Sequence, residues 1–194
     1  MPVAIKYDAK SYTNIDFLIK KNIINSKYLW KSFLKKNQNY IKIEKLKKFK
    51  FYNLPIKIEN FNQAHKYDTI ISVSCLEHVK DVESLFFNLK KNTTDKTTHI
   101  HLVNFSNHLD KKQPFKYIYE TNKNYFLEKY NPEINLLRIS DYINILNKNN
   151  YIFKVHILKK TNIKKVSISN YWKLNYNLND LSIVTAIIII EGFR

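Results

Sequence analysis

The chain has 194 residues, of which 44 % are hydrophobic and 14 % aromatic, and this composition excludes a disordered polar segment. Lysine and arginine total 33 against 16 acidic residues, which gives a formal net charge of +17. A length of this order suits one domain with a sizeable core, so we expect a single domain over residues 1–194.

The positive charge has two interpretations. A basic surface can bind nucleic acid or another polyanion. The alternative is compositional, because an abundance of Lys, Asn, Ile, Tyr and Phe is typical of an A/T-rich coding sequence and distributes lysine over the whole surface. Since dedicated nucleic-acid readers use arginine more often, we favour the compositional interpretation and keep a non-catalytic basic module as the alternative.

Two short segments indicate the cellular location, and the number of cysteines limits the possible disulfides and metal sites. Residues 1–6 have no basic-then-apolar leader, and the isoleucines at 187–190 are too few to span a bilayer, so we expect a cytoplasmic protein without a membrane partner. Cys75 is the only cysteine, which excludes an internal disulfide and a cysteine-based zinc site. Buried packing is favoured over a nucleophilic role for this thiol.

The first third of the chain is the harder part to interpret. An apolar run at 3–7 ends at Asp8, and Thr13–Asp16 could cap a helix with apolar residues at helical spacing to about residue 36. The lysine-rich stretch 42–50 is expected to be a solvated turn or a short basic helix, with a nucleic-acid patch as the sharper alternative. Residues 49–58 fit a short strand that cannot pair centrally at Pro55.

The rest of the chain alternates strand and helix patterns. The β-branched run 69–73 predicts a buried strand of a parallel sheet, covered by helices on both faces. The further expected elements are a helix at 81–91, a polar turn at 92–96, a strand at 97–105, a loop at 106–130, a helix from Ser140 or Asp141 to about 149, a strand at 151–158, an irregular stretch at 159–179 and a strand at 181–190. This order predicts an α/β fold with a mostly parallel sheet and an antiparallel closing strand.

Several short motifs occur in a fixed order. Residues 67–79 read Y-D-T-I-I-S-V-S-C-L-E-H-V, with small residues at the end of the strand and then L-E-H. This stretch resembles the fourth strand and following loop of class I S-adenosylmethionine-dependent methyltransferases. Residues 104–108 (N-F-S-N-H) are similar to a D-x-x-D-H segment of a bacterial branch of that family, and residues 135–142 (N-L-L-R-I-S-D-Y) to its N-R-(L/I)-R-x-S-(D/E)-Y segment. The resemblance covers residues 67–190 and leaves 1–66 as a divergent part.

The family's glycine-rich loop has no counterpart here, because the only glycine is Gly192. Two alignments of the N-terminus remain open. In the favoured one, residues 3–8 are the family's second strand, Asp8 is the acid that holds the ribose, and the first strand is missing. In the other, they are a degenerate first strand with Lys10 and Tyr12 where glycines belong. The implied sheet is Rossmann-like, and the chain is a truncated, decayed or pseudo-enzymatic member.

The resemblance implies S-adenosyl-L-methionine as the cofactor and a small-molecule acceptor, with a saccharide precursor as one candidate. Asp8 would hold the ribose, and Asn60 and Phe61 would line the adenine. The residues expected beneath the cofactor are Ser74, Cys75, Leu76 and Glu77.

The acceptor side has four candidates. His108 or His78 could act as the general base, because histidine titrates near neutrality. Asn104 and Arg138 would face the acceptor, Arg138 as the grip for an acidic group. The structural alternatives are a local hydrogen bond for His78 and an ion pair of Arg138 with Asp141 or Glu133. The aromatic stretch 115–130 could likewise cover the acceptor or belong to the core.

A metal site is not expected. His99 and His101 lie on one face of a predicted strand, with His108 after it. No acidic partner or fourth ligand is evident near them in the sequence.

Overall fold

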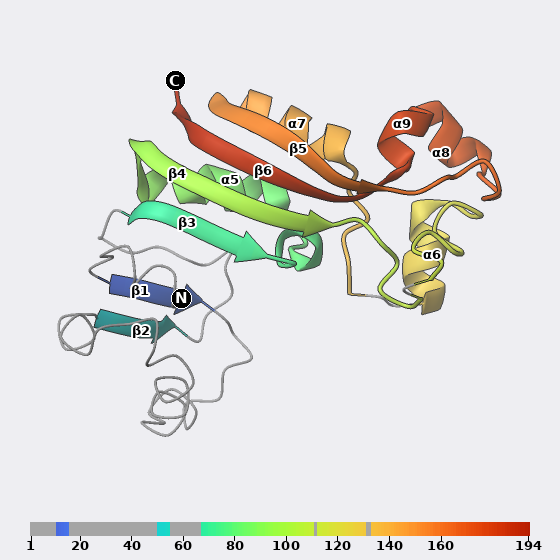
Figure 1. Cartoon of the computed structure of the whole chain (residues 1–194), viewed down its shortest axis with the longest axis horizontal. Coiled ribbons are helices and arrows are strands. Elements are labelled where there is room, and N and C mark those ends of the chain that lie inside the picture. Colours follow the sequence, from blue (N-terminus) through green and yellow to red (C-terminus); the bar gives the residue numbers. More distant parts are fainter. Residues whose placement is uncertain (1–10, 16–49, 55–66, 111, 131–132) are drawn as a thin grey trace. The chain divides into compact units, whose positions relative to one another are not determined.

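The computed structural model describes residues 11–15, 50–54, 67–110, 112–130 and 133–194 (Figure 1). The chain divides into two compact units, Met1–Phe61 and Asn62–Arg194. One domain over the whole chain stays a prediction. Among the described residues, no helix has the length and apolar character that crossing a membrane requires.

The first unit contains a two-stranded parallel sheet. β1 (Ser11–Ile15) pairs with β2 (Lys50–Leu54), with Ser11 opposite Lys50. β2 confirms the strand expected within 49–58. The expected helix start at Thr13–Asp16 is wrong, because Thr13 to Ile15 belong to β1. The apolar run 3–7 and the basic residues 42–49 lie outside the described residues.

The second unit contains a four-stranded sheet in the order β3-β4-β6-β5. Its strands are β3 (Tyr67–Val73), β4 (Thr93–Asn104), β5 (Tyr151–Lys160) and β6 (Ile183–Phe193). β3 and β4 are parallel neighbours, and β6 is antiparallel to both β4 and β5. Three strands therefore run in one direction and β6 in the other (Figure 1), which confirms the α/β fold with an antiparallel closing strand.

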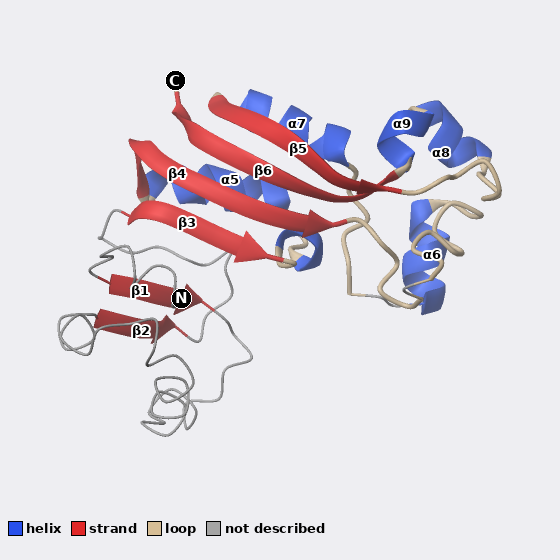
Figure 2. Ribbon diagram, viewed as in Figure 1, coloured by secondary structure: helices blue, strands red, loops and turns tan. Residues whose placement is uncertain are grey.

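Two helices cover one face of this sheet (Figure 2). They are α5 (Val82–Lys91), which packs against β4, and α7 (Ile139–Lys148), which packs against β5 and α5. Asp81 caps α5, since its carboxylate accepts a hydrogen bond from the Ser84 amide at 2.9 Å. The apolar residues of α5 that face the core are all buried: Val82, Leu85, Phe86 and Leu89.

The other face of the sheet differs from the prediction. Ile71 and Val73 are 60 % and 64 % exposed, and Ile100 opposite Ile71 is 36 % exposed. No helix among the described residues covers this face. Helices on both faces of the 69–73 strand were expected, and for the described part of the chain that expectation is wrong.

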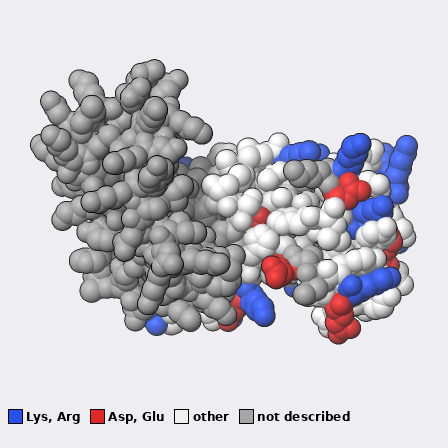
Figure 3. Space-filling model, turned by 90° about the horizontal axis from the view of Figure 1, so that it is seen from below, with Lys and Arg blue, Asp and Glu red and all other residues white. Residues whose placement is uncertain are grey.

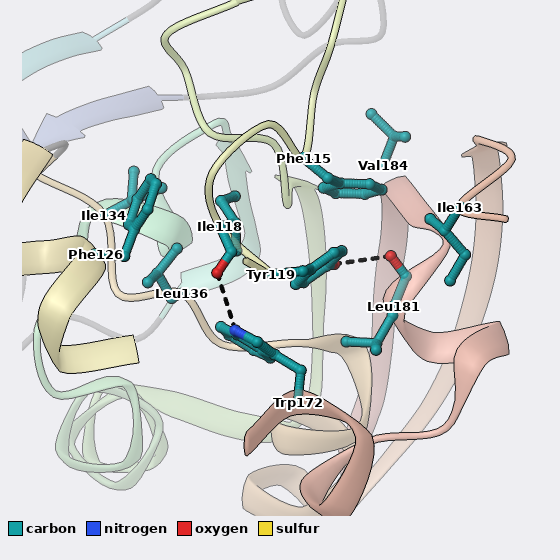
Figure 4. Close-up of a cluster of buried hydrophobic side chains, with 10 residues drawn as sticks. All are labelled: Phe115, Ile118, Tyr119, Phe126, Ile134, Leu136, Ile163, Trp172, Leu181 and Val184. Atoms are coloured by element: carbon teal, nitrogen blue, oxygen red, sulfur yellow. Dashed lines mark hydrogen bonds between the residues drawn. The ribbon is translucent and has the colours of Figure 1, made fainter. Parts of the chain in front are cut away.

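A second buried cluster lies beyond the carboxyl ends of β3 and β4, beside α6 (Lys123–Tyr130), α8 (Asn170–Asn175) and α9 (Leu178–Leu181) (Figure 1). Its members are Phe115, Ile118, Tyr119, Phe126, Ile134, Leu136, Ile163, Trp172, Leu181 and Val184 (Figure 4). The Trp172 indole Nε1 donates to the Ile118 carbonyl at 2.9 Å, and the Tyr119 hydroxyl donates to the Leu181 carbonyl at 2.8 Å. These rings form core, and the loops expected at 106–130 and 159–179 contain short helices instead.

The turn expected at 92–96 is also wrong, because β4 begins at Thr93. The start of β4 is irregular, with a register shift against β3 between Tyr67 and Thr69. The Thr97 hydroxyl donates to the Tyr67 carbonyl at 2.6 Å and accepts from the Thr94 amide at 2.9 Å. Side-chain hydroxyls thus complete the pairing of a polar segment that has few apolar residues to indicate a strand.

Candidate active site

The loop after β3 turns sharply into the site. Ser74 follows the last strand residue and has a φ of 46°, a left-handed conformation that is uncommon for a residue with a side chain. Its amide donates to the Leu102 carbonyl of β4 at 2.9 Å, which extends the parallel pairing by one bond. Leu76–His78 then form the single 3-10 turn η2. Strained backbone of this kind concentrates at functional sites.

Asn135 holds this loop in place. Its side-chain amide donates to the carbonyls of Leu76 and Val79 at 2.8 and 2.9 Å. Its main-chain amide donates to the Glu77 carbonyl at 2.7 Å. One asparagine thereby accounts for three carbonyls of the η2 turn and fixes the direction in which Glu77 and His78 project.

Glu77 is the unusual side chain of the site. It is 4 % exposed, and neither carboxylate oxygen has a hydrogen-bond partner of good geometry among the described residues. Burial raises the pKa of the Glu77 carboxyl above its ordinary value, and its own main chain, the charge of His78, the main chain of Asn104 and the Ser74 side chain oppose that rise, in this order. A buried carboxyl without hydrogen bonds of good geometry is costly to maintain.

Two imidazoles adjoin this carboxylate. His108 Nε2 lies 3.9 Å from Glu77 Oε1, and the His108 ring meets the His78 ring edge to face with centroids 5.1 Å apart. The Nδ1 of His78 donates to the Glu133 carbonyl at 2.8 Å. His108 has a φ of 58°, and burial together with His78 lowers the pKa of its imidazole. The structure therefore brings together Glu77, His78 and His108 from the two strand ends.

The remaining residues expected at this edge are close by in the chain. Leu76 is 2 % exposed and packs into the core. Cys75 is half-buried and immediately precedes η2. Asn104 ends β4, and its side-chain oxygen accepts a hydrogen bond from the Ser106 amide at 3.0 Å, which shapes the loop that leads to His108.

Arg138 does not lie at an accessible surface. It is 1 % exposed, and its Nη1 donates to the Phe105 carbonyl at 2.8 Å and to the Tyr119 hydroxyl at 3.2 Å. The guanidinium carbon also lies 5.6 Å from the centroids of the Tyr119 and Trp172 rings. The guanidinium thus contacts carbonyls, a hydroxyl and aromatic rings, whereas it is the main-chain amide of Arg138 that donates to Asp141, at 2.7 Å. We do not retain Arg138 as an acceptor-binding residue.

The expectation of no metal site concerned His99 and His101 of β4 together with His108, which follows that strand. His99 and His101 lie on the covered face of the sheet, each 1 % exposed, with rings 5.7 Å apart. His108 does have an acidic neighbour in the structure, because the Glu77 carboxylate lies 3.9 Å from its Nε2. Three ligand atoms, one from each of Glu77, His78 and His108, lie within 4.8 Å of one another.

Three predicted cofactor residues, Asp8, Asn60 and Phe61, lie outside the described residues. Their roles stay predictions. Asn135 is the residue that sequence reasoning missed, although it begins the N-L-L-R-I-S-D-Y motif. The arginine and the helix start are the features of this motif that suggested a role, whereas the side chain that reaches the site belongs to its first residue.

Comparison of the sequence with protein-family models and with curated proteins gives no match. Solved structures are similar at low identity. The YcgJ protein from Bacillus subtilis has a TM-score of 0.55 at 12 % identity, with 99 % of this chain and 87 % of that protein covered. An O-methyltransferase from a trans-AT polyketide synthase of Brevibacillus brevis, solved with S-adenosyl-L-homocysteine, has a TM-score of 0.56 at 11 % identity, with 100 % of this chain and 62 % of that protein covered. The chain has the class I methyltransferase fold that its sequence motifs predict.

Proposed function

We propose that this protein binds S-adenosyl-L-methionine and transfers its methyl group to a small-molecule acceptor. The proposal is supported by the fold and by the position of the candidate residues. In open α/β sheets, ligands bind outside the carboxyl ends of the strands. Ser74–His78 follow β3 and Asn104–His108 follow β4, and the two strands are parallel neighbours.

The observation that carries the proposal is the meeting of these two loops. Their separate sequence motifs would be of little significance if the side chains pointed apart. Instead, His108 Nε2 lies 3.9 Å from the buried carboxylate of Glu77. Ionisable groups of perturbed pKa at a sheet's carboxyl edge are typical of a reaction site.

Methyl transfer does not require the protein to form a covalent bond with either reactant. The acceptor's nucleophilic atom attacks the sulfonium methyl in line, the S–C bond breaks, and its electron pair stays on sulfur to give S-adenosyl-L-homocysteine. The protein aligns the two reactants and takes up the acceptor's proton. We assign Ser74, Cys75 and Glu77 to the cofactor side, and Asn104, His78 and His108 to the acceptor side. The buried Leu76 side chain anchors this loop in the core rather than contacting the cofactor.

The described part of one face gives no support to a polyanion-binding module, and the lysine-rich residues 42–49 lie outside the described residues. On the face shown in Figure 3, the described Lys and Arg side chains lie at separated points with Asp and Glu among them. A dispersed pattern of this kind is what the compositional interpretation predicts, since a polyanion needs a continuous basic track.

Calorimetric titration with S-adenosyl-L-methionine and with S-adenosyl-L-homocysteine tests the proposal. We expect micromolar binding of both that is lost in Asp8→Ala. The matched control is Asp68→Ala, which removes one carboxylate from an exposed position of β3 and is expected to bind normally. An absence of cofactor binding, combined with salt-sensitive binding of RNA, would overturn the proposal in favour of a basic module.

A further inference from the structure

Glu77, His78 and His108 form a cluster of three side chains that could each offer a ligand atom to a metal ion. One carboxylate oxygen and one nitrogen of each imidazole all lie within 4.8 Å of one another. Bonds of about 2.0–2.2 Å from a cation to nitrogen and oxygen ligands require these atoms to approach to about 3–3.5 Å. The two histidines are exposed enough to turn by that amount, whereas Glu77 is fixed by burial.

A second observation points to a ligand. Glu77 is 4 % exposed, and both of its carboxylate oxygens lack a partner of good hydrogen-bond geometry among the described residues. Buried carboxylates without such partners are rare in folded proteins, and a bound ion is one of the few explanations for them. The nearest cationic candidate, His108, lies 3.9 Å away and is charged only when protonated.

A hydrogen bond from a neighbouring loop also orients His78 for metal binding. The Glu133 carbonyl accepts a hydrogen bond from His78 Nδ1 at 2.8 Å, so in the neutral ring the lone pair lies on Nε2. A carbonyl that holds one ring nitrogen and leaves the other for the cation is the usual outer shell of a metal-binding histidine. Asn135 fixes the main chain of the same turn through the Leu76 and Val79 carbonyls.

We propose that Glu77, His78 and His108 bind a divalent first-row transition cation, with Zn²⁺ as the probe of choice. Two imidazoles and one carboxylate form a ligand set that zinc accepts, and the set leaves at least one coordination position for water or for an acceptor oxygen. Mg²⁺ is disfavoured because it prefers oxygen ligands alone.

Metal binding does not depend on the proposed methyl transfer and can be tested without cofactor. If both hold, the open position lies at the acceptor side of the site and favours an acceptor with a hydroxyl or carboxylate oxygen. Coordination of a hydroxyl acceptor would then withdraw charge from its oxygen and ease the loss of the hydroxyl proton to solvent water. His78 and His108 would act through the cation rather than as free bases.

The test is calorimetric titration of the metal-stripped full chain with Zn²⁺. We expect one Zn²⁺ per chain, with affinity lowered at least about tenfold in Glu77→Gln and in His108→Ala. His156→Ala is the matched control, because His156 is an exposed histidine of β5 outside the cluster, and it is expected to bind as the wild type does. Wild-type protein without stoichiometric uptake, or variants of unchanged affinity, would overturn the proposal.

Circular dichroism establishes that each variant is folded. The absorption spectrum of Co²⁺ bound to the wild-type protein is a second test of the ligand set, and it does not depend on the folding of any variant. We expect the visible absorption of a site of low coordination number, without a thiolate charge-transfer band, since Cys75 is not among the proposed ligands. The spectrum of hydrated Co²⁺, or a strong thiolate band, would contradict the assignment.

Discussion

His108 Nε2 and Glu77 Oε1 lie 3.9 Å apart, although one follows β4 and the other follows β3. Parallel pairing produces this proximity, because it places the carboxyl ends of neighbouring strands at the same edge. The pairing of Val73 with Leu102 brings the two loops out of the sheet together.

The first prediction concerns the stability of the metal-free protein. Glu77→Gln keeps the shape of the side chain and removes the charge of a buried carboxylate that has no hydrogen bond of good geometry, so we expect the free energy of unfolding at pH 7 to rise by about 1 kcal/mol or more. Urea denaturation in the presence of a chelator measures this. The control is Glu128→Gln, on the exposed surface of α6, with a change below about 0.5 kcal/mol. A marked loss of stability in Glu77→Gln would show that the carboxylate has a structural partner.

A second prediction tests the role of Asn135. In Asn135→Ala, the buried carbonyls of Leu76 and Val79 lose their donor, so we expect a loss of about 1–3 kcal/mol in the free energy of unfolding. Asn147→Ala removes the same group from the exposed side of α7 and is expected to have little effect. Equal denaturation midpoints for the two variants would refute a clamping role.

A third prediction is a dependence of stability on pH. Burial lowers the pKa of His99 to about 4 and that of His101 to about 3, from an ordinary value of 6.5. As pH falls below about 6.5, the unfolded chain takes up protons that the folded chain does not. Stability should therefore decrease by up to about 1.4 kcal/mol per pH unit for each histidine until the folded pKa is reached.

His99→Leu separates this effect from general acid denaturation. The ring of His99 has an unpartnered Nδ1, so a leucine of similar volume is tolerated and removes one proton-binding site. We expect a shallower decline of the urea midpoint between about pH 6.5 and pH 4. A decline as steep as that of wild type would show that His99 does not contribute to it.

A fourth prediction concerns the only glycine. Gly192 lies in β6 with a φ of 139°, and a Cβ at this position would lie 2.1 Å from the Asp95 carbonyl oxygen. Gly192→Ala combines backbone strain with a steric clash, so we expect a destabilisation of about 3 kcal/mol or more, measured by chemical denaturation. A change below about 0.5 kcal/mol would mean that β4 can retreat from β6 without cost.

The elements that local sequence determines were predictable. α5 could be placed at about 81–91 from apolar residues at helical spacing, and the structure has a helix at Val82–Lys91. The carboxyl edge of β3 could be placed because a β-branched run ends there in Ser74 and Cys75. Both signals are carried by residues close together in the chain.

The features that the sequence did not reveal depend on contacts between segments that are distant in the chain. Thr13 is a strand residue because β1 pairs with β2, and Ile71 is exposed because no described helix covers its face. Arg138 is buried among rings from Tyr119 and Trp172, which no local pattern reveals. The closeness of Glu77 to His108 likewise required the order of strands in the sheet.

The most direct test of a site at this edge is to follow backbone amide NMR signals during titration with S-adenosyl-L-homocysteine. The account predicts shifts concentrated at residues 74–78 and 104–108, with the signals of β5 unchanged. Saturable binding whose shifts fall elsewhere, or no shifts at millimolar ligand, would contradict it.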